Sequence, residues 1–368
     1  MAKVLVVIMN KDNAEGLSKC LESLTAQTCS ICKSFDVLIV DGGSNDNSYE
    51  VASKFKEKYP CIEFIVQRVK GGVGPARIEA IHYALKHNYD LIIWGDSENV
   101  YDPNYVSEIL KWIYEKGCDI VSGRTMVNTE SSIWSKIFFW YHSLHLFLKR
   151  LSKIHAPGNN KAVKAFIYKH VNYPPSSRSD DYYFTYLLLK KGLIKRVKVC
   201  HADKARLLAS IPSTFSDVVR WQKARVKGLV EGALIIGRPP PIDTYAWILF
   251  ALAPFLAITL LLTGHLTLFT IASTLIIISV LVLSAIFYKL INHYNVVVNC
   301  ESQYLIPLLG IMGTYLHGLF TLYYMIYFTL KIKLLKVDIL KKMNSILKMF
   351  KLSPTLITLK KDIFGMRK

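Results

Sequence analysis

Hydrophobic and polar residues alternate in two different ways along this chain of 368 residues. Up to about residue 241, short apolar runs alternate with segments in which apolar residues recur every three or four positions, the patterns of strands and helices. Strands are predicted near residues 3–9, 35–41, 62–66, 90–94 and 118–122, and helices near residues 13–27, 46–58, 75–88 and 103–116. This alternation predicts an α/β fold, a Rossmann-like and mostly parallel sheet with helices on both faces and functional loops at the carboxyl ends of the strands.

The second pattern is an almost uncharged stretch over residues 242–330. Its only Lys, Arg, Asp or Glu residues are Asp243, Lys289 and Glu301. Three segments within it are long enough to cross the hydrocarbon core of a bilayer, at residues 245–262, 266–288 and 303–330. The composition therefore predicts a globular domain over residues 1–238, a transmembrane region over 239–330 and a separate tail over 331–368.

The tail is strongly basic, with eleven Lys or Arg residues against Asp338 and Asp362, in a chain of net charge +19. Between its lysines, apolar residues recur at the spacing of an amphipathic helix: Ile332, Leu335, Ile339, Met343, Ile346 and Phe350. Next to a transmembrane region, such a helix suits a membrane surface with anionic headgroups, so membrane lipids and no nucleic acid are the expected partners. The alternative is a solvated charged helix.

Two further features are less specific. The seven cysteines include no Cys–His cluster with zinc spacing, and Cys29 and Cys32 form a lone CxxC, so reduced structural cysteines are expected. Residues 131–152 predict an aromatic-rich helix, which is either a core helix or an interfacial helix lying against lipid.

Acidic residues occur at three places along the predicted domain. Asp41 follows the second strand, Asp96 and Glu98 follow the strand that ends near residue 94, and Asp180 and Asp181 come later. Asp96 and Glu98 are two residues apart, so in extended chain they point the same way and can converge on one cation. Bridging a pyrophosphate needs a hard cation with oxygen ligands, such as Mg²⁺ or Mn²⁺. Three acidic sites in this order indicate sugar-nucleotide chemistry.

A glycine-rich segment from Gly71 to Arg77 opens a predicted helix. Backbone amides and the positive end of the helix can approach phosphate there. Lys70 and Arg77 are cationic candidates for that phosphate, and Arg77 is alternatively a structural partner of Asp96.

These motifs, in this order, resemble the family 2 glycosyltransferases, inverting nucleotide-sugar-dependent enzymes with the GT-A fold, over residues 3–228. The resemblance equates Asp96-Ser97-Glu98 with the DxD metal motif of that family, with Glu98 in place of the second Asp. In family terms Asp41 would contact the base or the ribose. The resemblance implies a nucleotide-binding set made of Asn10, Asp41, Gly43, Lys70, Arg77 and Asp96.

The resemblance also implies residues for the reaction. Asp181, in the position of the acidic pair of the family, would be the general base that deprotonates the acceptor hydroxyl, and Asp180 would cap or orient. Gln222 and Arg225 are similar to the Gln-x-x-Arg-Trp segment of processive polysaccharide synthases and would reach the acceptor or the diphosphate. Val226 stands where that segment has Trp, which puts processivity in doubt.

The expected function is that of a membrane-anchored, metal-dependent inverting glycosyltransferase, which moves a sugar from a UDP- or GDP-sugar to a lipid-linked or membrane-proximal glycan. The alternatives are a polyprenyl-phosphate sugar synthase, a processive polysaccharide synthase and a non-catalytic membrane scaffold. The catalytic domain and the basic tail are both expected on the cytoplasmic side. Three spans would place them on opposite sides, unless the third segment, with Gly310, Gly313 and Gly318, is re-entrant or split.

Overall fold

The computed structural model describes residues 2–127, 132–138, 158–240, 242–294 and 305–358. In this part of the chain, one eight-stranded sheet has the strand order β3-β2-β1-β4-β7-β6-β8-β5. The strands are β1 (Val4–Asn10), β2 (Asp36–Asp41), β3 (Ile62–Val66), β4 (Leu91–Asp96), β5 (Asn99–Tyr101), β6 (Ile120–Val127), β7 (Lys161–Lys164) and β8 (Val199–Ala209). β1 to β4 pair in parallel, whereas β7 is antiparallel to both β4 and β6.

The sheet is buried on both faces, as the alternation in β1 shows. Val4, Val6 and Ile8 join one hydrophobic core, and Leu5 and Val7 join the other. The first face is covered by α1 (Ala14–Thr25), α2 (Ser48–Lys58) and α4 (Tyr105–Tyr114), and the second by α3 (Val73–Lys86) and α7 (Asp180–Lys190). Short 3₁₀ helices occur at η1 (Ala165–Lys169), η2 (Leu193–Lys195) and η3 (Pro354–Leu356). The predicted α/β class with helices on both faces is confirmed.

Parallel pairing brings the polar strand ends together. Asn10 at the end of β1 pairs with Asp41 at the end of β2, and Met9 pairs with Asp96 at the end of β4. The three polar positions therefore lie side by side at the carboxyl edge of the sheet, where α/β proteins bind their ligands.

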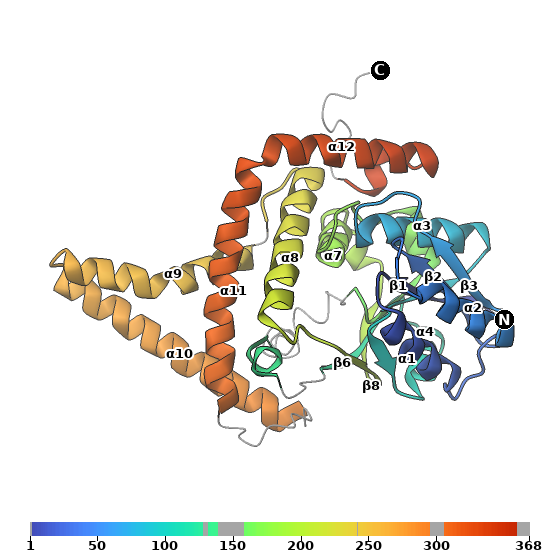
Figure 1. The fold of residues 1–368 in the computed structure, drawn as a ribbon, viewed down its shortest axis with the longest axis horizontal. Helices are drawn as coiled ribbons and strands as arrows, with labels where there is room; N and C mark the ends of the chain where they lie inside the picture. The colour runs from blue at the N-terminus through green and yellow to red at the C-terminus, as the bar shows by residue number, and fades with distance from the viewer. Residues whose placement is uncertain (1, 128–131, 139–157, 241, 295–304, 359–368) are drawn as a thin grey trace.

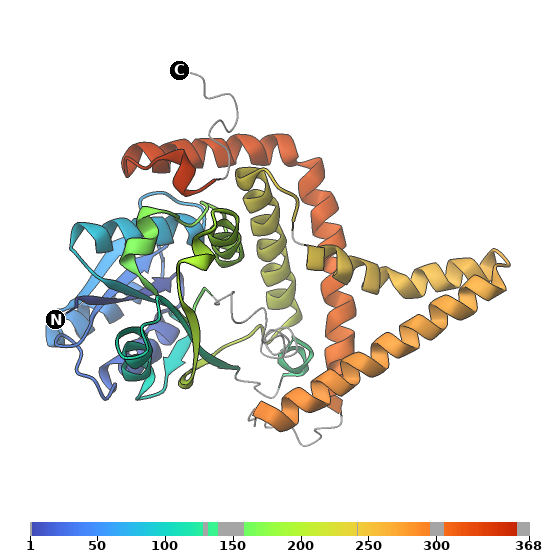
Figure 2. The same cartoon turned by 180° about the vertical axis from the view of Figure 1, so that it is seen from behind.

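Five long helices follow the sheet: α8 (Phe215–Ile236), α9 (Ile242–Leu262), α10 (Leu266–Tyr294), α11 (Leu305–Leu330) and α12 (Ile332–Met349). In Figure 1, α9 and α10 form a hairpin that projects away from the sheet, and α11 runs beside α8. α12 turns back from the end of α11 and crosses over the domain that contains the sheet, which is also visible from behind in Figure 2.

The α9–α10 hairpin is apolar and uncovered. Residues Thr244–Leu262 and Leu266–Ile286 are strongly apolar, and hardly any of these residues are buried by the rest of the protein. Water is an unfavourable environment for so much exposed apolar surface. By length and composition, these two helices are candidate membrane spans.

The third predicted segment behaves differently. α11 reaches the composition of a membrane span only together with α12, and the two helices are bent by 79° at Lys331. Gly318 does not split α11, because it lies where α9 and α11 cross: a Cβ at this position would come within 2.4 Å of the Trp247 carbonyl oxygen. The third segment is therefore not split at its glycines: the bend comes after its last residue, Leu330, and Gly318 permits close helix packing.

The basic tail forms the predicted amphipathic helix, but its apolar side contacts protein. Met343 and Ile346 are fully buried in the core shared with α3 and α7. The ring of Phe350 lies 4.9 Å from the ring of His82 on α3. The face that remains exposed carries most of the lysines together with a few apolar residues, namely Lys333, Leu334, Lys336, Val337, Lys341 and Lys348.

The expectation of reduced cysteines is wrong for four of the seven. Cys32 is bonded to Cys61, and Cys118 is bonded to Cys200, because β6 and β8 are paired neighbours. Cys29 has no disulfide partner among the described residues, so the CxxC is not a unit. Disulfides occur in oxidising compartments and also inside hyperthermophiles, so they do not place the domain on either side of a membrane.

The aromatic-rich helix predicted over residues 131–152 lies mostly outside the described residues. Within residues 132–138, Ile137 and Phe138 are buried against Val218 of α8. This short part is a core segment.

Candidate active site

The turn after β2 is organised by the Asp41 carboxylate, which is almost fully buried. Its Oδ1 accepts hydrogen bonds from the backbone N–H groups of Gly43 and Ser44 at 2.8 and 2.7 Å. Its Oδ2 accepts from Ser44 Oγ at 2.6 Å and from Asn10 Nδ2 at 2.8 Å. Asp41 therefore shapes the turn, and the group left for a ligand is Asn10 Oδ1, which is buried without a hydrogen-bond partner in the described structure.

Lys70 lies over the same turn. Its Nζ donates to the Gly42 carbonyl oxygen at 3.2 Å, and a Cβ added to Gly43 would lie 2.1 Å from this nitrogen. Gly43 also has φ +83°, a conformation that favours glycine. These two observations explain why residue 43 is a glycine. The Lys70 contact also places a cation at the turn after β2.

Asp96 ends β4 and Glu98 follows it, on the opposite side of β1 from this turn. Asp96 Oδ1 is buried and has no hydrogen-bond partner in the described part of the chain. Burial raises the pKa of Asp96, with Arg77 and Arg178 opposing the rise. The pKa of Glu98 is raised to about 7, mainly because nearby protein atoms desolvate its carboxylate and secondly because the Asp96 charge lies close by. The residue nevertheless keeps part of its surface exposed to solvent.

These two carboxylates fit a divalent cation. Two like charges and one unsatisfied buried oxygen are stabilised by a cation between them. No cluster of three or more His, Cys, Asp or Glu side chains suited to a metal occurs among the described residues. Magnesium sites often combine one or two carboxylates with substrate phosphates, and Asp96 and Glu98 suit that arrangement.

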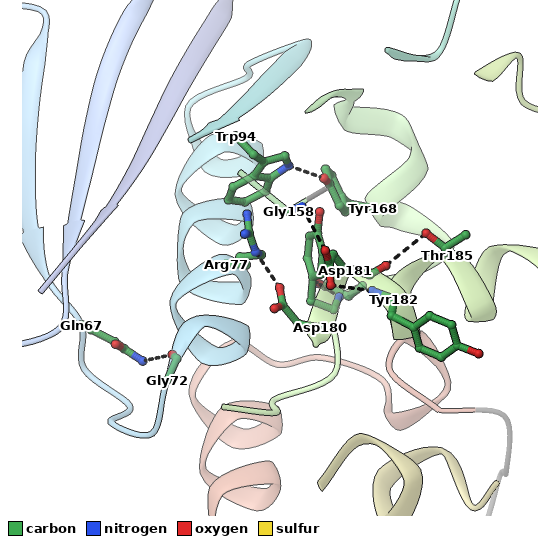
Figure 3. A network of polar contacts seen from close by, with 12 residues as sticks. Gln67, Gly72, Arg77, Trp94, Gly158, Tyr168, Asp180, Asp181, Tyr182 and Thr185 are labelled. Carbon is green, nitrogen blue, oxygen red and sulfur yellow. Dashed lines mark hydrogen bonds and ion pairs between the residues drawn. The ribbon is translucent and has the colours of Figure 1, made fainter. Parts of the chain in front are cut away.

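The acidic pair at the start of α7 divides into two environments. Asp180 is buried and forms an ion pair with Arg77 of α3, with 2.6 Å between Oδ2 and Nε. The Arg77 guanidinium also lies over the rings of Trp94 and Tyr173, at 4.9 and 5.3 Å from their centres. Figure 3 shows Arg77 between Trp94 and Asp180. The principal partner of Arg77 is thus Asp180 rather than Asp96.

Asp181 is the more accessible member of the pair. Its Oδ2 accepts a hydrogen bond from the Gly158 N–H at 3.0 Å, as Figure 3 shows. The charges of Asp180 and Asp181 both contribute to the raised pKa of Asp96, after burial. The third acidic site therefore lies within electrostatic reach of the metal motif, although 85 residues separate Asp96 from Asp181.

The glycine-rich turn before α3 uses its backbone N–H groups in contacts within the protein, whereas the sequence predicted that they could approach phosphate. The N–H groups of Val73 and Gly74 donate to the carbonyl oxygens of Ser177 and Ser176, at 3.1 and 3.0 Å. A Cβ on Gly74 would lie 2.3 Å from the Pro174 carbonyl oxygen. These glycines thus allow close packing against the loop before the acidic pair, and the first amides of α3 are already used.

Gln222 and Arg225 of α8 face α11 instead of the strand ends. Gln222 is fully buried, with its Nε2 2.5 Å from His317 Nδ1. Arg225 Nη1 donates to Thr321 Oγ1 at 3.4 Å. Their spacing does put them on one helix face, as expected, but that face meets another helix.

Two cations near the acidic residues were not expected from the sequence. Arg178 is exposed, and its charge opposes the rise in the pKa of both Asp96 and Glu98. Lys161 of β7 is buried, and burial lowers its pKa to about 8, with Asp181 and Asp180 opposing the shift. Arg178 stands directly before Ser179-Asp180-Asp181, which is the only sequence signal for it.

A mixed α/β sheet, a polar turn after β2, carboxylates at and just after the end of β4 and an acidic pair at the start of α7 are the features of a GT-A type domain. Residues 4–171 match the family model described as Glycosyl transferase family 2. The resemblance to family 2 glycosyltransferases that was drawn from the motifs of this domain is thereby confirmed.

Individual relatives are distant. The glycosyltransferase GlyG of Streptococcus pneumoniae is 28% identical over 120 residues, which are 33% of this chain and 38% of that protein. The poly(ribitol-phosphate) beta-glucosyltransferase of Bacillus spizizenii is 26% identical over 212 residues, 52% of this chain and 33% of that protein. The chain spans 38%, 18% and 24% of the lengths of the first curated relatives it matches.

Among solved structures, the chain is similar to the mannosyltransferase PcManGT from Pyrobaculum calidifontis, a complex with GDP-Man and Mn²⁺. The TM-score is 0.50 at 14% identity, over 86% of each chain. At this identity the likeness shows the fold.

Proposed function

We propose that this protein is a membrane-anchored, inverting glycosyltransferase that moves a sugar from a UDP- or GDP-sugar to a lipid-linked or membrane-proximal acceptor. The observation that carries the proposal is the convergence of the three acidic sites at one edge of the sheet. Asp41 and Asp96 end the two strands that flank β1, and the charge of Asp181 reaches Asp96. Carboxylates gathered at the carboxyl edge of an α/β sheet, with the pKa values of Asp96 and Glu98 raised, are typical of an active site.

In this proposal the nucleoside binds over the turn after β2. Asp41 and Gly43 give the turn its shape, and the unsatisfied Asn10 Oδ1 accepts from the ligand. Lys70 is close enough to the turn to bind the diphosphate, and Arg178, beside the metal motif, would offset charge on the departing nucleotide. Arg77 acts indirectly, by fixing Asp180 at the start of α7.

Asp96 and Glu98 would hold Mg²⁺ or Mn²⁺, which supplies charge stabilisation for the leaving diphosphate when bound. Asp181 would take the proton of the acceptor hydroxyl as that oxygen attacks the anomeric carbon from the side opposite the nucleotide. Attack from that side inverts the anomeric configuration. We assign Gln222 and Arg225 to the contact between α8 and α11, because their partners on α11 are His317 and Thr321.

The proposed activity is tested by nucleotide release from purified protein in lipid, with UDP- and GDP-sugars, Mg²⁺ or Mn²⁺, and polyprenyl phosphate or a lipid extract as acceptor. Metal-dependent release from one donor that rises when acceptor is added is the expected result. Release with polyprenyl phosphate alone would identify a polyprenyl-phosphate sugar synthase. Nucleotide binding without release under any of these conditions would contradict the transferase and favour a scaffold.

The α9–α10 hairpin is proposed to be the membrane anchor, with two spans that return the chain to the side it started from. Two spans remove the conflict posed by three, since the catalytic domain and the basic tail can then both be cytoplasmic. Epitope tags inserted after Gly264, between the two helices, and after Lys368 test this topology in intact cells. The first tag should be labelled from outside and the second only after permeabilisation; labelling of both from one side would refute the spanning hairpin.

A further inference from the structure

Four segments that are far apart in the sequence meet beside the candidate active site. They are the glycine-rich turn 70–74, the loop 174–178 before the acidic pair, helix α8 and helix α12. The first two contribute Lys70 and Arg178 to the site, as described above. α8 and α12 belong to the C-terminal half of the chain, and Figure 1 shows α12 crossing over this region.

Glu231 of α8 holds the loop 174–178. Its side chain is 3% exposed, and its Oε2 accepts a hydrogen bond from the Ser177 N–H at 2.5 Å. Two lysines balance its charge: Lys227 Nζ lies 3.7 Å from Oε1, and Lys342 Nζ lies 3.9 Å from Oε2. A buried carboxylate needs such partners, because an unpaired buried charge is strongly destabilising.

Lys342 of α12 holds the glycine-rich turn. Its Nζ donates to the Gly71 carbonyl oxygen at 3.1 Å, and its side chain is 12% exposed. Gly71 and Gly72 have φ of +121° and +105°, so this part of the turn depends on backbone conformations open mainly to glycine. Glycine backbone is also the most costly to order, so contacts from outside the turn decide how well it is fixed.

We propose that Lys342 and Glu231 are positioning residues for the transfer reaction: this clamp fixes the glycine-rich turn and the loop before the acidic pair relative to each other. The inference rests on the proposed function. The Lys342 ammonium group contacts the glycine-rich turn and faces the Glu231 carboxylate, and this carboxylate accepts a hydrogen bond from the loop 174–178. Both loops also pair directly, through Val73 with Ser177 and Gly74 with Ser176. Docking of α12 thereby becomes a condition for an ordered active site.

The kinetic test compares Lys342→Met with Lys341→Met, a change of the exposed neighbouring lysine on the same helix. Lys342→Met should lower kcat roughly tenfold, because displaced reacting groups cost rate steeply. The Kd for the nucleoside alone, which is proposed to bind over the turn after β2, should change less than about threefold, since that turn is fixed by its own hydrogen bonds. Lys342→Arg, which keeps the charge and donors, should recover most of the rate, and Lys341→Met should match the wild type.

A second variant, Lys227→Met, removes one of the two lysines that balance the Glu231 charge but leaves the Lys342–Gly71 contact in place. Among the described residues, Lys227 has no contact with the glycine-rich turn. This variant should leave kcat within about twofold of the wild type. A loss as large as that of Lys342→Met, or a failure of Lys342→Arg to restore the rate, would overturn the role of the Gly71 contact.

Hydrogen exchange gives a readout that does not depend on activity. The amides of Val73, Gly74 and Ser177 should exchange faster in Lys342→Met than in Lys341→Met, at equal global stability. Unchanged exchange at these amides would contradict the clamp whatever the kinetics show. Absence of transfer in the wild type, with faster exchange in the variant, would instead contradict the proposed function and leave the clamp standing.

Discussion

Replacing Asp181 by asparagine is expected to lower sugar transfer by at least about a hundredfold, the range in which general bases contribute. Donor binding should persist, because the strand ends and the turn after β2 are untouched. Asparagine retains an oxygen that can accept from the Gly158 N–H, the contact that holds Asp181 at 3.0 Å. Single-turnover transfer from labelled donor measures the loss, and titration with UDP or GDP measures binding.

The neighbouring carboxylate provides an informative contrast. Asp180→Asn breaks a buried ion pair with Arg77, which costs about 3–5 kcal/mol when one partner is removed. Its thermal stability should therefore fall together with its activity, whereas Asp181→Asn should keep the melting temperature of the wild type. Asp102→Asn, at an exposed site, controls for the loss of a carboxylate as such. Near-normal turnover of Asp181→Asn would refute the base assignment.

The sequence was sufficient to predict the parallel half of the sheet, because its strands are unbroken apolar runs separated by amphipathic helices. In the other half, the sequence predicts β6 near residues 118–122 but not β5, β7 or β8. β7 is four residues long and contains the buried Lys161, and β8 contains His201, Asp203 and Lys204. Their strand conformation depends on pairing with β4 and β6, which is a tertiary effect.

For the site, residue type and order predicted which side chains gather but not how they pair. Asp41 and Asp96 could be found because parallel strands end at one edge. The Arg77–Asp180 ion pair joins residues 103 positions apart, and no local spacing signals it. The glycine-rich turn fits a phosphate loop and a packed turn equally well by composition, and only the contacts of Gly74 distinguish the two.

The tail shows the same limit of periodic patterns. Spacing of Ile339, Met343 and Ile346 predicts an amphipathic helix, but it does not say what the apolar face meets. Here that face packs onto the domain, since the bend after Leu330 directs α12 back over α3. Only the lysine-bearing face of α12 remains available to a membrane surface, so any contact of α12 with lipid depends mainly on charge.

Replacing Asp96 and Glu98 together by asparagine and glutamine is expected to abolish metal-dependent transfer. A cation stabilises the leaving diphosphate by several kcal/mol, so the loss should reach at least about a hundredfold in rate. Mn²⁺ titration of the wild type after chelation should restore transfer, and the double variant should not respond. Glu115→Gln, a change of an exposed carboxylate, should respond like the wild type.

Stability distinguishes this effect from damage to the fold. Without a cation, Asp96 and Glu98 repel each other, and the repulsion contributes to the raised pKa of Glu98. Removing both charges should therefore keep or raise the melting temperature in metal-free buffer, since like charges at one site cost stability. Mn²⁺ with UDP or GDP should raise the melting temperature of the wild type but not that of the variant. An inactive variant with a lower melting temperature would indicate a structural role, and unchanged activity in chelator would refute the metal site.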